Sequence, residues 1–422
     1  MKRVRGVRGI FSRFISYGFT VCLLAGLSAC GTLTSVNEAQ KTAKTTPLIL
    51  ISIDGFRADY LKRGLTPVLM QMADQGARAE SMRPSFPSIT FPNHYTLVTG
   101  LRPDHHGIVS NTMEDAAIPG GQFQLSRREA VTDRRWWDQA EPIWVSAEKA
   151  GVRTATMYWP GSEADIHGVR PSYWKVFDHK VSAEDRVDQL LAWLDLPPSQ
   201  RPAFLTLYFD EVDHMGHEYG PDSGQVNEAL RHVDAAVGRL VAGLSKRHLD
   251  ANIITVSDHG MAATSEQRLI ALKPILPEGS YRLVVSRAYA GLEPLVGYER
   301  ELASALARTY PHMQCWPKAQ LPARFEYGHN PRVPAYICLA DTGWLIVDEK
   351  KPGEQISAGA HGYDNLHPDM GALFIAQGPA FRSHQVFDGL DNVDVYPLLM
   401  RLLNVPALPS DGRAEATAAL LR

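Results

Sequence analysis

Cysteine is scarce in this sequence, and its scarcity limits the class of protein. Only 4 cysteines occur among 422 residues, too few for a domain held together by a network of disulfides. An excess of one charge is also missing, because the formal net charge is -3, and this balance indicates no nucleic-acid-binding surface. The sequence has no internal repeat and no low-complexity segment. What remains is an ordinary globular chain, with room for one large α/β domain with insertions or for two domains.

The long apolar run of the chain is confined to its first thirty residues. A basic stretch precedes the apolar residues 14–27, which are too few for a comfortable membrane span. The run ends in Leu-Ser-Ala-Cys, which resembles a bacterial lipoprotein signal with Cys30 as the acylated first residue of the mature chain. We therefore expect a lipoprotein-type signal peptide over residues 1–30, a polar tether over residues 31–46 and a membrane-anchored periplasmic protein. Simple secretion is the alternative.

Two cysteines remain in the mature domain, Cys315 and Cys338. In an oxidising periplasm, a lone pair of cysteines favours a disulfide. Closing a loop of this length would stabilise the fold by about 3 kcal/mol in the chain-entropy account. Two unpaired thiols are the alternative.

Five short apolar runs predict the strands of a buried, mostly parallel sheet. They cover residues 47–53, 151–159, 203–209, 252–257 and 371–376. Helical patterns alternate with these runs, chiefly at residues 66–76, 227–247 and 393–403. This alternation predicts an α/β fold with helices on both faces of the sheet. Residues 263–355 break the rhythm with short strand-like pieces interrupted by proline and glycine, and we expect a small inserted subdomain there.

Acidic residues follow three of the predicted strands, as Asp54, as the segment 210–213 and as Asp258 with His259. Ligands of open α/β sheets gather beyond the carboxyl ends of the strands, so these side chains should meet at one edge. A single Asp after a strand is usually a turn residue or a helix cap. Three such positions, two of them with histidine nearby, favour a shared site.

Candidate metal ligands are dense after the third predicted strand. Asp213 and His217 are four residues apart, which places them on one face of a helical turn. Asp210 and His214 have the same spacing, so spacing leaves both pairs open. His361 is a further candidate, and mixed Asp and His ligands suit zinc or a similar divalent ion.

Thr90 precedes Phe91 and Pro92 at the start of a predicted helix that ends near residue 99. Proline is well placed in a first helical turn, so we expect Thr90 at the N-cap, where an anionic phosphate is favoured. An ordinary N-cap is one interpretation and a nucleophile is the other, and a nucleophilic threonine needs a base or a metal. Two ions about 4 Å apart can clamp the oxygens of a phosphoryl group. Asn111 could donate a hydrogen bond to a non-bridging oxygen.

Five motifs occur together in the chain. They are Asp54-Gly-Phe-Arg57, Thr90-Phe-Pro-Asn-His94, Glu211-x-Asp-x-x-Gly-His217, Asp258-His-Gly-Met261 and His361-Gly-x-Asp-Asn365. Together they resemble the nucleotide pyrophosphatase/phosphodiesterase family of the alkaline phosphatase superfamily, in its compact bacterial form. The resemblance implies an alkaline-phosphatase-like catalytic domain over residues 47–405 with the insert at about 263–355. A C-terminal tail would follow over residues 406–422.

The resemblance also implies two zinc ions per chain and assigns the residues that serve them. One ion would be bound by Asp54, Thr90, Asp258 and His259. The other would be bound by Asp213, His217 and His361, because the family carries a glycine just before the ligand histidine, as Gly216 stands here. Thr90 would be the nucleophile and Asn111 the oxyanion donor. A nucleobase would lie against Phe91 and Tyr208, with Phe177 or Trp174 adding to that pocket.

The implied function is a zinc-dependent phosphodiesterase/nucleotide pyrophosphatase that releases 5′-monophosphates through a phospho-Thr90 intermediate. Its partner would be a small nucleotide or nucleotide-like diester, with membrane contact only through the lipid anchor. The sequence lacks the Cys/Ser-x-Pro-x-Arg sulfatase signature. It also lacks an evident arginine clamp for a dianionic monoester, which favours a singly charged diester. A lipid-head-group (glycerophosphodiester or phosphocholine) or phosphonate ester hydrolase is the alternative on the same fold. A non-catalytic binding lipoprotein is the alternative of another class.

Overall fold

The computed structural model describes residues 46–351, 353 and 355–422 of the chain. The expected signal peptide with its Cys30, and all of the expected tether except Thr46, lie outside the described residues. Among the described helices, none combines the length and the apolar character that crossing a membrane requires.

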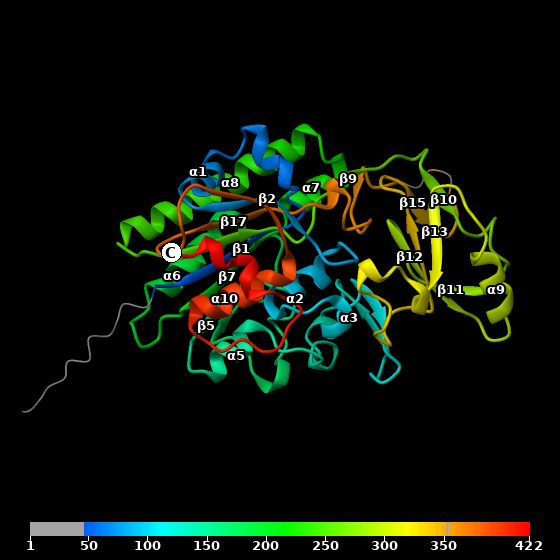
Figure 1. The fold of residues 1–422 in the computed structure, drawn as a ribbon, viewed down its shortest axis with the longest axis horizontal. Helices are drawn as coiled ribbons and strands as arrows, with labels where there is room; N and C mark the ends of the chain where they lie inside the picture. The colour runs from blue at the N-terminus through cyan, green and yellow to red at the C-terminus, as the bar shows by residue number, and fades with distance from the viewer. Residues whose placement is uncertain (1–45, 352, 354) are drawn as a thin grey trace, which may run out of the picture. The chain divides into compact units, whose positions relative to one another are not determined.

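An eight-stranded central sheet carries the fold (Figure 1). In spatial order its strands are β18 (Gln385–Asp391), β2 (Ala77–Arg83), β17 (Phe374–Gln377), β8 (Asn252–Val256), β1 (Leu48–Ile53), β7 (Phe204–Phe209), β5 (Thr154–Met157) and β6 (Tyr173–Trp174). β17 runs antiparallel to its neighbours β8 and β2, and all other neighbouring pairs are parallel. The expected mostly parallel α/β sheet is confirmed.

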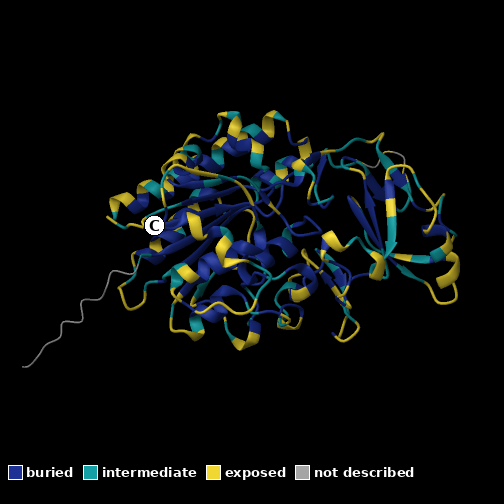
Figure 2. Ribbon diagram, in the orientation of Figure 1, coloured by how far each residue is buried: buried dark blue, intermediate teal, exposed yellow. Residues whose placement is uncertain are grey.

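Helices cover both faces of this sheet, as the alternating side chains of β1 require. Ile49, Ile51 and Ile53 pack in one core with α1 (Pro67–Gln75), α6 (Ala183–Leu194) and α8 (Gly224–Lys246). Leu48 and Leu50 belong to the opposite core, with α2 (Thr90–Thr99), α5 (Ile143–Lys149) and α10 (Val395–Leu403). Figure 2 shows the central strands buried between helices whose outer faces are exposed.

The sheet register brings three strand ends together. β1 lies between β8 and β7, and Ser52 at its end pairs with Val256 on one side and Tyr208 on the other. The residues that follow these strands therefore emerge side by side at one edge of the sheet. The candidate active site lies at this edge of the sheet.

A separate four-stranded antiparallel sheet lies within residues 281–340. Its strands, in spatial order, are β11 (Tyr281–Val285), β12 (Tyr289–Pro294), β14 (Tyr336–Ala340) and β13 (Met313–Pro317). Helix α9 (Glu299–Leu306) and the strand pair β10 (Leu269–Ala271) and β15 (Leu345–Val347) share its apolar cluster. Cys315 and Cys338 face each other across β13 and β14 and form a disulfide, as expected.

The end of the expected C-terminal tail, residues 406–422, packs against the fold, although most residues of this segment are exposed. The 3-10 turn Ala414–Leu420 is followed by backbone hydrogen bonds that join Leu420 to Arg382 and Arg422 to Ala380. Leu420 and Leu421 are buried. Two leucines among the last three residues anchor this segment. An apolar pattern this short does not predict a helix or a strand from the sequence.

Candidate active site

Three acidic residues stand at the carboxyl ends of adjacent strands. Asp54 follows β1, Asp210 follows β7 and Asp258 comes two residues after β8. Asp54 and Asp258 are buried, with 1% and 0% of their surfaces exposed. The expectation that these positions converge is therefore met by the geometry of the sheet.

Helix α7 (Glu211–Tyr219) begins directly after β7 and supplies the next pair of ligand types. Asp213 and His217 lie on its inner face, with 3.5 Å between Asp213 Oδ2 and His217 Nε2. The competing pair is placed differently. Asp210 forms an ion pair with Arg186 at 2.7 Å, and the side chain of His214 is 69% exposed. Asp213 and His217 are thus the pair that joins the buried cluster.

Three histidines turn their Nε2 atoms into the cluster. His217, His259 and His361 each place Nδ1 within 3.1 Å of a backbone carbonyl oxygen, those of Gly359, Gly260 and Ser88 respectively. A carbonyl oxygen can only accept, so each Nδ1 carries a proton and, in a neutral ring, each Nε2 presents a lone pair. His217 Nε2 and His361 Nε2 nevertheless lie 3.0 Å apart. Two facing lone pairs at this distance fit a bound cation.

The carboxylates indicate a cation as well. Among the described residues, Asp54 Oδ1, Asp213 Oδ1 and Asp258 Oδ2 are buried and make no hydrogen bond, and each lies within 3.5 Å of a histidine Nε2. Buried unpaired carboxylate oxygens are costly, and a metal ion is their usual partner. In the part of the chain that the structure describes, two groups of side chains have the spacing to hold a metal ion. They are Asp54 with Asp258 and His259, and Asp213 with His259 and His361.

The two groups form one continuous polar cluster. His259 belongs to both, and its ring stacks on that of His361 with the centroids 3.5 Å apart. Burial and the charges of Asp258 and Asp213 raise the pKa of Asp54 well above its usual range. Burial also acts to raise the pKa of Asp258, but His259 and His94 hold it well below its usual range. Carboxylates that repel one another in a buried space fit divalent cations.

Thr90 is the first residue of α2 rather than its N-cap. Ile89 occupies the N-cap position in an extended conformation, and no side chain caps the helix there. The Thr90 hydroxyl is consequently free to face the cluster, and its Oγ1 lies 3.3 Å from His259 Nε2. Asn111 lies beside it and accepts a hydrogen bond from the Phe91 N–H at 2.9 Å through Oδ1. This bond leaves the Nδ2 group of Asn111 as the donor for the pocket.

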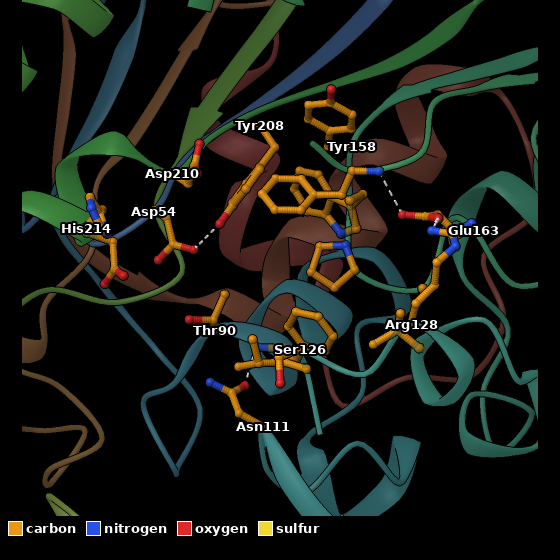
Figure 3. A pocket seen from close by; sticks show the side chains of 18 of the residues that line it. Asp54, Thr90, Asn111, Ser126, Arg128, Tyr158, Glu163, Tyr208, Asp210 and His214 are labelled. Carbon is orange, nitrogen blue, oxygen red and sulfur yellow. Dashed lines mark hydrogen bonds and ion pairs between the residues drawn. The ribbon is translucent and has the colours of Figure 1, made fainter. Parts of the chain in front are cut away.

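A pocket of about 620 Å³ opens from this cluster (Figure 3). Phe91, Tyr208 and Phe177 all line it, whereas the pocket lining does not include Trp174. The guanidinium of Arg170 instead lies over the ring of Trp174, with 5.5 Å between Arg170 Cζ and the centroid of the ring. The pocket wall is largely apolar, with Leu125, Val131, Tyr158, Pro160 and Val176 among its residues.

The site also contains residues to which the sequence assigned no role, and of these only His94 has a local signal. Arg128 and Glu163 form an ion pair at 2.6 Å on the far wall of the pocket, although they are 35 residues apart. His94 is fully buried, and its Nδ1 lies 2.9 Å from the Thr90 carbonyl oxygen. His94 follows Thr90 by four residues, so helical spacing could have linked it to the backbone of the nucleophile candidate.

Comparison with known proteins decides the family. Residues 48–364 match the family described as type I phosphodiesterase / nucleotide pyrophosphatase. The chain belongs to this family. Its members are phosphodiesterase and nucleotide pyrophosphatase hydrolases, so the chain is an enzyme of this type, and the expected family and activity class are confirmed.

Relatives of this hydrolase span most of the chain. An uncharacterised pyrophosphatase/phosphodiesterase of Schizosaccharomyces pombe is 41% identical over 407 residues, covering 92% of this chain and 83% of the relative. The bis(5′-adenosyl)-triphosphatase enpp4 of Xenopus laevis is 37% identical over 407 residues, covering 96% of this chain and 86% of the relative.

Solved structures of mouse ectonucleotide pyrophosphatase/phosphodiesterase 5 are similar to the hydrolase in fold. The mouse protein superimposes with a TM-score of 0.85 at 35% identity, covering 89% of this chain and 100% of the mouse chain. One of these structures is an inactive threonine-to-alanine variant in complex with AMP, with the same scores.

Proposed function

We propose that this hydrolase cleaves nucleotide phosphodiester or pyrophosphate bonds, releasing a 5′-monophosphate through a covalent phosphate on Thr90. The observation that carries the proposal is the position of Thr90 Oγ1, 3.3 Å from His259 Nε2 in a cluster of unpartnered carboxylate oxygens. A nucleotide substrate is supported by the pocket beside Thr90 and by the AMP complex of the mouse relative.

We assign two zinc ions to the cluster, because its donors are aspartate oxygens and imidazole nitrogens. Asp54, Thr90, Asp258 and His259 would hold one ion, and Asp213, His217 and His361 the other. When bound, the ions would supply positive charge for the attacking and the departing oxygen. Two observations fit these two sets. The carboxylate oxygens without a hydrogen bond belong to Asp54, Asp213 and Asp258. The Nε2 atoms that face each other belong to His217 and His361.

The residues of the chain itself have separate tasks in the reaction. The Thr90 hydroxyl loses its proton to solvent and its oxygen attacks phosphorus, the P–O bond to the leaving group breaks, and the nucleoside 5′-monophosphoryl group is left esterified to Thr90. The Nδ2 group of Asn111 donates to a non-bridging oxygen as negative charge develops. Water then hydrolyses the phospho-Thr90 ester and frees the hydroxyl. Two in-line displacements at phosphorus give net retention of configuration.

Substitution of Thr90 tests the proposal. Thr90→Ala removes the attacking oxygen, and we expect the turnover of the p-nitrophenyl ester of thymidine 5′-monophosphate to fall about 10³-fold or more. Thr90→Ser is the matched control, because it keeps the hydroxyl and should retain measurable activity. Thr90→Ala protein that is folded and turns over this ester at the wild-type rate would refute the covalent route.

A further inference from the structure

Tyr208 contacts the buried polar cluster through its hydroxyl as well as lining the pocket through its ring. The phenol donates a hydrogen bond of 2.6 Å to Asp54 Oδ2 (Figure 3). Tyr208 is the second-last residue of β7 and pairs with Ser52 of β1, so the sheet itself fixes this contact. The other oxygen of the same carboxylate, Asp54 Oδ1, makes no hydrogen bond among the described residues and lies 3.4 Å from His259 Nε2.

Asp258 shows the same division between its two oxygens. Asp258 Oδ1 lies 3.3 Å from the Gly55 N–H and 3.4 Å from the Ser257 hydroxyl. Asp258 Oδ2 is buried, makes no hydrogen bond to the backbone or to a hydroxyl group of the described residues, and lies 3.0 Å from Nε2 of His259, another member of the candidate metal site. Each carboxylate thus has one oxygen bound by the protein and one oxygen left for a ligand. For Asp54, the donor is a side chain that a substitution can remove without changing the backbone.

The ring of Tyr208 is poorly placed to act mainly as a stacking surface. Only 9% of the residue is exposed. Its ring meets Phe177 edge-on, with the centroids 6.0 Å apart, and meets His94 edge-on at 5.3 Å. Phe177, by contrast, is 45% exposed at the mouth of the pocket. The most specific interaction of Tyr208 is therefore the one made by its hydroxyl.

We propose that Tyr208 is a positioning residue, whose hydroxyl holds Asp54 so that only Oδ1 faces the zinc site formed with Asp258 and His259. Partners that orient a ligand in this way typically change metal affinity by about 10- to 100-fold when they are removed. The inference rests on the proposed function for the identity of the metal. It differs from a role in base stacking, because it assigns the effect to one oxygen atom rather than to the ring.

The test is Tyr208→Phe, which removes the hydroxyl and keeps the ring. Zinc is titrated into the metal-free protein in competition with a chromogenic chelator, a measurement that needs no turnover. We expect one of two zinc-binding steps to weaken about 10- to 100-fold. With the thymidine monophosphate ester, kcat at limiting zinc should fall and recover in excess zinc, while KM stays within about twofold of the wild-type value.

Tyr173→Phe is the matched control. The Tyr173 hydroxyl donates to the Gln200 carbonyl oxygen, and the residue is outside the pocket lining, so its zinc titration should match that of the wild type. Tyr208→Phe protein with wild-type zinc affinity, with or without a raised KM, would overturn the proposal. So would an equal loss of melting temperature with and without zinc, since the hydroxyl would then serve stability alone. Failure of the wild type to hydrolyse any nucleotide diester would instead overturn the proposed function and leave the titration valid.

Discussion

Phe177 is an example of a residue that lines the pocket but lies apart from the candidate catalytic residues. It lies at the open end of the pocket, with its ring 5.1 Å from that of Tyr158, and its N–H donates to Glu163 at 2.9 Å. Among the described residues, it makes no hydrogen bond or ion pair with the candidate metal ligands. An exposed aromatic ring at this place can stack on a base without taking part in the reaction at phosphorus.

Phe177→Ala should therefore raise KM for a nucleotide substrate and leave the chemical step intact. Stacking on an aromatic side chain contributes about 1–3 kcal/mol per base, so we expect KM for the thymidine monophosphate ester to rise about tenfold. Steady-state kinetics with bis(p-nitrophenyl) phosphate, which has no base, should show little change. Tyr298→Ala, at another exposed aromatic outside the pocket lining, is the control. An equal effect on both substrates would contradict a role in base binding.

Part of the site was predictable from local sequence, and the rest depends on tertiary contacts. Asp54 and Asp258 follow apolar runs that give clear strand signals, so their convergence follows from the rule for parallel sheets. The choice of Asp213 over Asp210 does not follow from spacing, because it depends on the ion pair with Arg186. The bond from Tyr208 to Asp54 joins residues 154 positions apart, and no local pattern encodes it.

At the scale of elements, three helices meet around His232. Its Nδ1 lies 2.6 Å from Glu211 Oε2 at the start of α7, and its Nε2 lies 3.0 Å from Glu184 Oε1 on α6. His232 itself is on α8. The hydrogen bond to Glu211, together with the charges of Glu211 and Glu184, raises the pKa of His232 above its ordinary value of 6.5. Protonated His232 thus ties α6 and α8 to the helix that carries Asp213.

Because the pKa of His232 is raised in the folded state, its contribution to folding stability should decrease as the pH rises. The imidazolium is favoured in the folded state, so its contribution is fully present below pH 6.5 and is lost as pH rises through the folded pKa. His232→Gln should lower the free energy of unfolding at pH 6 and make it less sensitive to pH above 6.5. Urea unfolding of both proteins at a series of pH values measures this. Parallel pH profiles for the two proteins would count against the three-helix contact.

The strands show why element prediction succeeds in the centre of a sheet and fails at its edge. β1, β7 and β8 are buried on both faces, so each is a continuous apolar run. β2 and β18 were missed because polar residues interrupt them, including Glu80 and Ser81 in β2 and Asp388 in β18. β17 lies at one of the predicted apolar runs, but it runs antiparallel to its neighbours β2 and β8. Hydrophobic runs do not specify the direction of a strand.

At the scale of the whole molecule, we propose that the chain is a periplasmic lipoprotein, anchored through Cys30. Cys30→Ala removes the acylated residue, so labelled palmitate should no longer be incorporated into the enzyme. Activity toward the thymidine monophosphate ester should persist, because the catalytic residues begin at Asp54. Equal labelling of the variant and the wild type would contradict the anchor.

The central claim is that the buried cluster holds two metal ions beside Thr90. The most direct measurement is an anomalous difference map, collected at the zinc absorption edge from crystals of the zinc-loaded protein. We predict two peaks about 4 Å apart, one next to Asp54, Asp258 and His259 and the other next to Asp213, His217 and His361. A map without anomalous peaks at these side chains would contradict the account.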